Sequence, residues 1–167
     1  MSKPPVTQTE IELARREWMA WHKRTYLESG GAEGHILDLR DIGGLRFTTT
    51  LLLETVGAKS GQKRLAPLIY GDFGGEVIVV ASKGGADIHP SWYPNIKASK
   101  EVTIQIATQA FRATWREPAG AERAAIWDFM AKLYPPYVDY KAATKREIPL
   151  VMFTVTEPAD ILKPRSV

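Results

Sequence analysis

Three β-rich segments follow one another between residues 46 and 82, with only short glycine-containing turns between them. The segments at residues 46–56, 62–71 and 76–82 are rich in β-branched and large apolar side chains, which favour strands. Turns of four or five residues are too short for the crossover that parallel neighbours require, so consecutive strands must be antiparallel. This feature argues against a doubly wound parallel sheet.

Three later segments also predict strands, and helical segments interrupt them without alternating with every strand. The pattern predicts an α+β, mainly β fold of about six mostly antiparallel strands flanked by helices. A small barrel fits this count best, because closure protects the edges of so few strands. The later strands are expected at residues 101–107, 110–116 and 148–158, and the helices at residues 9–28, 91–99 and 120–134.

Alternation within the segments predicts which side chains the fold buries. In residues 101–107, Val102, Ile104 and Ile106 are expected to face the interior, and Thr103 and Gln105 to face outward. The segment at residues 76–82 is apolar on consecutive positions, which predicts a strand covered on both faces.

Length and composition restrict the class of protein. A chain of 167 residues predicts a single domain, residues 1–167, with residues 1–44 as an N-terminal helical extension. The absence of cysteine excludes a disulfide framework, a thiolate metal site and a cysteine nucleophile. His22, His35 and His89 lack the spacing of metal ligands, so no metal is expected.

Charge and the N-terminal sequence bear on partners and location. A net charge of +3 suits a small anionic ligand or a membrane surface and gives little support to nucleic-acid binding. The first ten residues carry no apolar signal segment, so a cytoplasmic protein is expected. Peripheral contact with the inner face of the cell membrane stays open.

The first helix, residues 9–28, has two interpretations. Thr9 and Glu12 predict a capping box, and one helical face gathers apolar side chains. That face would either pack on the domain or, with the basic residues around it, rest on a lipid surface. Its apolar members are Ile11, Ala14, Trp18 and Trp21.

Two basic, glycine-rich loops follow the first and third strands. Lys59, Lys63 and Arg64 surround two glycines in residues 57–64, and Lys83 precedes Gly84 and Gly85. Antiparallel order brings both loops to the same end of the fold. Backbone N–H groups freed by glycine, together with lysine or arginine, form sites for phosphate or carboxylate, although solvent-exposed turns also have this composition.

Aromatic residues gather near the second loop and after the helix at residues 120–134. Trp92 and Tyr93 follow the loop, and Tyr134, Tyr137 and Tyr140 recur at a spacing of three, which places them on nearly one helical face. Such a group either packs in the core or forms a flat slot for a planar ring system.

These motifs together resemble the deazaflavin (F420)-dependent nitroreductase family, which comprises split-β-barrel flavin and deazaflavin oxidoreductases of actinobacteria. The resemblance spans roughly residues 45–155. It rests on G-x-K-S-G-x-x-R-x-x-P from residue 57, A-S-K-G-G from residue 81, H-P-x-W-Y from residue 89 and Y-P-x-Y-x-x-Y from residue 134.

The resemblance implies a bound reduced deazaflavin, coenzyme F420, which carries a phosphate and an oligoglutamate tail. It implies cofactor-binding roles for the two loops and the wall beside the ring, at Lys59, Ser60, Arg64, Pro67, Ala81, Ser82, Lys83 and Gly84. It implies a substrate side formed by Trp92, Tyr134, Tyr137 and Tyr140, with Ser82, Tyr137 and Tyr140 as catalytic candidates. Relatives often carry Arg or Lys where Ala58 stands and Pro where Lys63 stands, so binding of the tail is expected to differ here.

The expected activity is therefore that of an F420H2-dependent oxidoreductase, with hydride transfer to a quinone, a nitroaromatic compound, or an enone or unsaturated lactone such as a coumarin. An FMN-dependent enzyme on the same barrel and a non-catalytic flavin or deazaflavin carrier are the alternatives. The small-molecule acceptor is the expected partner, and the oligomeric state is left open.

Overall fold

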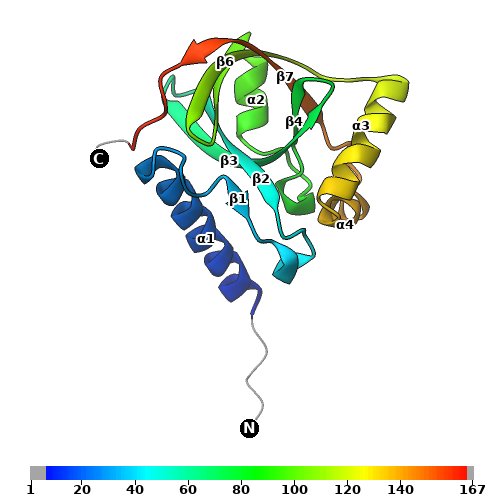
Figure 1. The fold of residues 1–167 in the computed structure, drawn as a ribbon. Helices are drawn as coiled ribbons and strands as arrows, with labels where there is room; N and C mark the ends of the chain where they lie inside the picture. Colours follow the sequence, from blue (N-terminus) through cyan, green and yellow to red (C-terminus); the bar gives the residue numbers. More distant parts are fainter. Residues whose placement is uncertain (1–6, 165–167) are drawn as a thin grey trace.

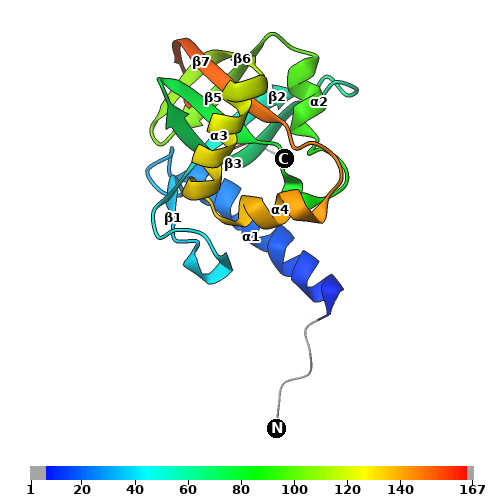
Figure 2. The same cartoon turned by 90° about the vertical axis from the view of Figure 1, so that its right-hand side faces the viewer.

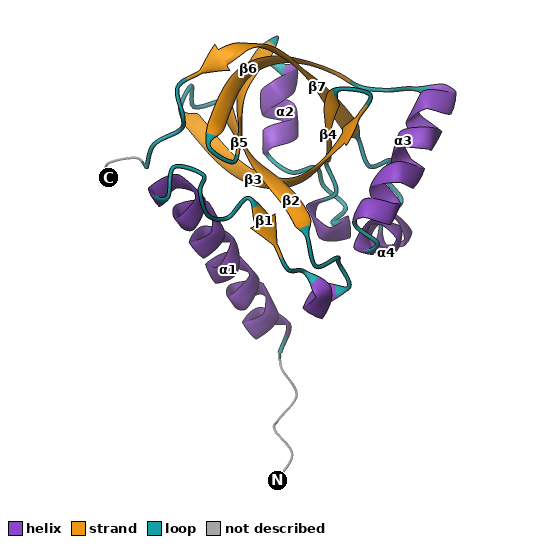
Figure 3. Cartoon of the chain, in the orientation of Figure 1, coloured by secondary structure: helices purple, strands orange, loops and turns teal. Residues whose placement is uncertain are grey.

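The structure is a computed structural model that describes residues 7–164. A β-barrel occupies its centre, and helices lie at its end and along its side (Figure 1, Figure 3). In chain order the elements are α1 (Gln8–Glu28), β1 (Ile36–Leu37), the 3-10 turn η1 (Arg40–Ile42), β2 (Thr48–Val56), β3 (Lys63–Phe73), β4 (Glu76–Val80), the 3-10 turn η2 (Lys83–Gly85), α2 (Trp92–Lys97), β5 (Glu101–Ile106), β6 (Gln109–Arg116), α3 (Gly120–Leu133), α4 (Pro136–Ala143) and β7 (Leu150–Ala159).

Six strands close the barrel in the order β2-β3-β4-β7-β6-β5, and β5 pairs again with β2. Every pairing is antiparallel, as the short turns require. The two-residue strand β1 adds to the edge of β2, where Leu37 is the partner of Thr48. The predicted mainly β barrel is thus confirmed, while β1, η1 and η2 were not expected from the sequence.

The barrel interior holds one apolar cluster, and α2 closes one end of it (Figure 1). Trp92, Tyr93 and Ile96 of α2 are buried against inward-facing strand residues such as Leu51 and Ile104. Ile96 and Ile104 have no exposed surface. The short helix therefore acts as a plug for the core.

A second apolar cluster lies outside the barrel, beneath α3 and α4. Ile78 and Val80 of β4 face this cluster, whereas Val77 and Val79 face the interior. All four side chains are buried, which confirms that this strand is covered on both faces. Ile126 and Met130 of α3 complete the cluster from above.

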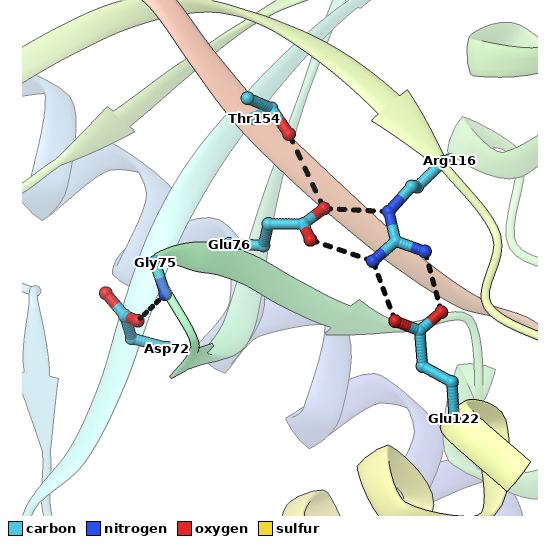
Figure 4. A network of polar contacts seen from close by, with 6 residues as sticks. All are labelled: Asp72, Gly75, Glu76, Arg116, Glu122 and Thr154. Carbon is cyan, nitrogen blue, oxygen red and sulfur yellow. Dashed lines mark hydrogen bonds and ion pairs between the residues drawn. The ribbon is translucent and has the colours of Figure 1, made fainter.

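An ionic network fastens α3 to the barrel (Figure 4). The guanidinium of Arg116, at the end of β6, donates to both oxygens of Glu76 on β4 at 2.9 and 2.8 Å. It also donates to both oxygens of Glu122, in the first turn of α3, at 2.7 and 3.0 Å. The paired arginine lowers the pKa of each carboxyl.

Among the side chains of α1 that the structure describes, only those in its C-terminal half are buried. His22, Tyr26 and Leu27 are buried, whereas residues 13–21 are all exposed. The Tyr26 hydroxyl accepts a hydrogen bond from the Ala107 N–H at 2.8 Å. Ala14, Trp18 and Trp21 therefore do not form the packing face that the periodicity suggested, and the side chain of Ile11 lies outside the described residues.

One local expectation was wrong. The capping box is formed by Thr7 and Glu10; the predicted Thr9 lies inside the helix, and the Glu12 side chain is not among the described residues. The alternation of β5 is confirmed, since Val102 and Ile104 belong to the interior cluster and Thr103 and Gln105 do not, but Thr103 and Gln105 are buried as well. Gln105 is fully buried and accepts a hydrogen bond from the Leu162 N–H at 2.7 Å.

Candidate active site

The two basic loops leave the same end of the barrel, as predicted. Strands β2 and β4 both run antiparallel to β3, so their C-terminal ends point the same way. In Figure 2 the β2–β3 connection, α2 and η2 all lie at the right-hand side of the molecule. The start of α1 lies at that side as well (Figure 2).

The β2–β3 connection is a compact turn with exposed cations. The Gly57 N–H donates to the Gln62 carbonyl at 2.7 Å, and the Ser60 hydroxyl accepts from the Gln62 N–H at 3.2 Å. Lys59 and Arg64 are exposed, and neither forms an ion pair with a residue in the described range 7–164. The turn therefore presents two positive side chains on a braced backbone.

Asn95 joins this turn to α2. Its side-chain oxygen accepts from the Ala58 N–H at 3.0 Å, and its amide donates to the Thr55 hydroxyl at 3.3 Å. Asn95 is buried, and these two hydrogen bonds provide partners for its polar amide. No sequence motif singled out this residue, because its partners are about 40 positions away.

The loop after β4 has an unusual backbone. Ser82 is right-handed, with φ −80° and ψ −37°, and Lys83, Gly84 and Gly85 have φ of 45°, 63° and 83°. Among residues 7–164, no acceptor pairs with the backbone N–H groups of Ser82, Lys83 or Gly84. A right-handed residue followed by a left-handed one turns successive N–H groups into a concave anion-binding nest. The backbone of Ser82 and Lys83 therefore has the alternation of angles that such a nest requires.

Arg146 holds this loop in place from the segment between α4 and β7. It donates to the carbonyl oxygens of Ala86 at 2.7 Å, Ser82 at 2.8 Å and Ala81 at 3.2 Å. It also donates to Nδ1 of His89 at 3.0 Å, so the neutral imidazole carries its proton on Nε2. Burial lowers the pKa of His89, and the positive charge of Arg146 lowers it further. No motif in the sequence pointed to Arg146.

The three predicted tyrosines come together at the junction of α3 and α4. The Tyr134 and Tyr137 ring centroids are 4.9 Å apart, and the Tyr134 and Tyr140 hydroxyl oxygens are 3.3 Å apart. Burial raises the pKa of Tyr134 and of Tyr137, which keeps both phenols protonated at neutral pH. Tyr137 is buried, and Tyr140 is half-buried.

The tyrosines also meet the nest loop. A methyl group built on Gly85 would lie 3.0 Å from both the Cα and the carbonyl oxygen of Tyr140. A side chain at this position would therefore crowd the Tyr140 backbone. The positive φ of Gly85 is a second reason for glycine here. The structure thus joins Ser82, Lys83 and Gly84 to Tyr140 and Tyr134 in one patch.

Other predicted residues lie apart from that patch. Trp92 is only 5% exposed and packs in the barrel core, in a different cluster from Tyr134 and Tyr137. Pro67 lies opposite Leu52 in the β2–β3 pairing. Ala81 is buried, and its N–H donates to the Pro149 carbonyl at 2.9 Å.

Two shallow cavities lie elsewhere on the molecule. One, of about 460 Å³, is lined by Lys97, Ala98, Ser99, Lys100 and Trp115. The other, of about 240 Å³, is lined by His89, Tyr93, Glu117, Pro118, Arg123, Glu147, Pro149 and Leu150. Neither includes a predicted site residue, so we place the candidate site on the loops, where the nest and the tyrosines meet.

A protein family and a curated relative are both similar to this chain and share one description. A family model described as F420H(2)-dependent quinone reductase matches residues 18–155. The F420H(2)-dependent quinone reductase Rv1261c of Mycobacterium tuberculosis is 36% identical over 108 residues, which cover 63% of this chain and 72% of the relative.

Two solved structures are also similar. The F420-H2 dependent reductase FDR-A is 42% identical, with a TM-score of 0.57 over 62% of this chain and 92% of its own. A protein described as a domain-swapped dimer is 37% identical, with a TM-score of 0.60 over 83% of this chain and 98% of its own.

Proposed function

The chain belongs to the F420H(2)-dependent quinone reductase family, and we propose that its paired basic loops bind reduced coenzyme F420 for hydride transfer to a planar, electron-poor acceptor. The protein is accordingly an F420H2-dependent oxidoreductase with coenzyme F420 as its cofactor. The observation that carries the proposal is the meeting of an unpaired N–H nest, exposed cations and tyrosine hydroxyls at one end of the barrel.

The donor groups fit the anionic part of this cofactor. A phosphate and an acidic tail require N–H donors and cations, and the loops offer Lys59, Arg64 and Lys83 as exposed side chains. The braced β2–β3 turn, with Ser60 in it, would hold one anionic group, and the nest from Ser82 to Gly84 would hold another ligand oxygen. Pro67 and Ala81 would form the wall beside the ring.

When bound, the reduced deazaflavin supplies the hydride. The protein's own residues would orient the acceptor and stabilise charge that develops on its oxygen. Ser82, Tyr137 and Tyr140 are the proposed hydroxyl donors. Tyr140 has the best support, because its hydroxyl lies 3.3 Å from that of Tyr134 and its backbone packs on Gly85.

We propose quinones as the first acceptor class, with nitroaromatics, enones and unsaturated lactones as further substrates. The clustered rings of Tyr134, Tyr137 and Tyr140 offer an apolar aromatic surface with hydroxyls, which suits a flat molecule with ring oxygens. Trp92 is also proposed for the substrate side on the resemblance alone, since it is buried in the barrel core in this structure.

Titration of the cofactor tests the proposal directly. Deazaflavin fluorescence should be quenched, or its anisotropy should rise, on addition of the protein, and a panel of acceptors should then re-oxidise the reduced cofactor. No change in fluorescence would end the proposal. Binding without oxidation of any acceptor would favour a carrier, and a bound yellow chromophore in the purified protein would favour FMN.

We further propose that residues 1–44, as the N-terminal helical extension of the single barrel domain, contact a membrane surface. Within the described chain, no helix has the length and apolarity to cross a bilayer. Large apolar side chains of α1 nevertheless face outward, with Leu13 at 56%, Trp18 at 41% and Trp21 at 47% exposure. Flotation with anionic liposomes should occur with the full chain and be lost without residues 1–30; equal flotation of both would contradict it.

A further inference from the structure

The first half of α1 carries one basic side chain toward the domain. Arg15 shares a helical face with His22 and Tyr26, because positions seven and eleven apart lie on one stripe. His22 donates to the Gly34 carbonyl at 2.8 Å, and Tyr26 is fully buried, so this stripe faces the barrel. The continuing helix therefore places Arg15 beside the barrel end.

Arg15 makes its contact at the nest. A methyl group built on Gly84 would lie 2.5 and 2.7 Å from the two terminal nitrogens of the Arg15 guanidinium. The guanidinium thus lies directly on the Gly84 backbone, where any side chain would displace it. Gly84 also has a φ of 63°, a left-handed backbone that favours glycine whatever the space around it.

Positive charge accumulates at this point without a partner. Lys83 precedes Gly84 and is exposed, and no described carboxylate forms an ion pair with Arg15 or Lys83. The neighbouring N–H groups of Ser82, Lys83 and Gly84 are also without acceptors in the range 7–164. Two cations around a ring of unpaired donors form an arrangement that an oxyanion stabilises.

We propose that Arg15 is a binding residue of the active site, which holds an oxyanion of the bound cofactor together with Lys83 and the nest of Ser82, Lys83 and Gly84. The inference rests on the proposed function and adds to it an element outside the barrel. Phosphate and tail carboxylate share this chemistry. The N-terminal helix is then part of the cofactor site, in addition to any role at a surface.

The test measures affinity for coenzyme F420 by fluorescence anisotropy with the full-length protein. Arg15→Ala should weaken binding at least about tenfold, because a hydrogen bond to a charged group is lost. Arg16→Ala is the matched control, since it removes the same charge from the next exposed position and should change affinity less than about twofold. Arg15→Lys should fall between, because lysine keeps the charge but loses the planar fork.

A second ligand identifies the group that is bound. The deazaflavin riboside without phosphate and tail should bind wild-type protein and Arg15→Ala equally. If inorganic phosphate displaces the cofactor, the group that Arg15 holds is the phosphate; if a short oligoglutamate displaces it, that group is the tail. Either result supports the proposal when Arg15→Ala weakens binding of the same competitor. Equal weakening of riboside and intact cofactor would overturn it.

A double-mutant cycle separates a functional contact from a structural one. Gly84→Ala should displace the guanidinium, so Arg15→Ala should have a smaller effect in that background. Fully additive effects would contradict the inference, as would normal affinity of Arg15→Ala. Absence of cofactor binding by the wild-type protein would instead contradict the proposed function. Arg15 is exposed, so thermal unfolding should be unchanged in Arg15→Ala.

Discussion

The guanidinium of Arg146 donates a hydrogen bond to the Ser82 carbonyl oxygen at 2.8 Å, across 64 residues of chain. The same side chain also binds the carbonyls of Ala81 and Ala86. Carbonyls that point to Arg146 leave the N–H groups of the loop to point elsewhere, which makes the nest available. Arg146 is thus a positioning residue for the site.

Replacement of Arg146 should loosen this loop. Arg146→Ala removes the donor of several half-buried hydrogen bonds, which should destabilise the fold by about 1–3 kcal/mol. We expect the dissociation constant for coenzyme F420 to rise about tenfold or more, with partial rescue in Arg146→Lys. Denaturant unfolding and fluorescence titration measure the two effects. Lys145→Ala, at an exposed neighbouring position, should change neither.

The exposed lysines of the two loops should govern cofactor affinity more than turnover. Lys59→Ala combined with Lys83→Ala should raise the dissociation constant about 10- to 100-fold, since two charge-assisted contacts are lost. The turnover number at saturating cofactor should change less than about threefold, because uniform binding is lost. Lys132→Ala on α3 is the control. Reduced turnover at unchanged affinity would refute this assignment.

Loss of the Tyr140 hydroxyl should slow the reaction without affecting cofactor binding. Tyr140→Phe should lower the turnover number about 10- to 100-fold if the phenol donates to the acceptor oxygen. Tyr137→Phe is the comparison, because the Tyr137 side chain is largely buried and its hydroxyl forms no hydrogen bond with a residue in the range 7–164. We expect a smaller loss there. Steady-state kinetics with a quinone, beside cofactor titration, would show a wrong assignment as equal effects of both variants.

The approach of Gly85 to Tyr140 should make this glycine more critical than others with positive φ. Gly85→Ala adds backbone strain and a methyl group 3.0 Å from the Tyr140 backbone, so we expect a loss of about 2–4 kcal/mol in unfolding free energy. Gly74→Ala has a similar strain at φ 62° but no atom within 4 Å, and should lose about 1 kcal/mol. Equal losses in urea unfolding would mean that the contact contributes nothing.

The ionic network of Arg116 with Glu76 and Glu122 should make a contribution to stability that is lost in acid. Arg116 lowers the pKa of Glu76 and of Glu122 below the ordinary value of 4.5, so the unfolded chain takes up protons first as the pH falls. The stabilisation is present above about pH 4.5 and is lost as the pH falls through the lower folded-state values. The melting temperature of Arg116→Gln should be lower than that of wild type at pH 7, and the difference should shrink near pH 3. A difference independent of pH would exclude this origin.

The sequence predicted correctly those features that depend on residues close together in the chain. Short glycine turns required antiparallel order, and the consecutive apolar residues of β4 predicted burial on both faces. The spacing of Tyr134, Tyr137 and Tyr140 correctly indicated that the rings meet. The alternation correctly placed Gln105 on the outer face of β5, but it did not indicate that this face is buried, because the residues that cover it come from the two ends of the chain.

By itself, the sequence determined the antiparallel barrel and the common end of the two basic loops, because turn length and the pattern of apolar residues are local properties. Only the tertiary structure decided which distant side chains complete the site. Arg15, Asn95 and Arg146 contact backbone groups that lie 37 to 69 positions away in the sequence. Arg146 binds several carbonyl oxygens at once. Such contacts depend on how α1, α2 and the α4–β7 segment pack around the barrel end, and packing between distant segments leaves no periodicity in the sequence.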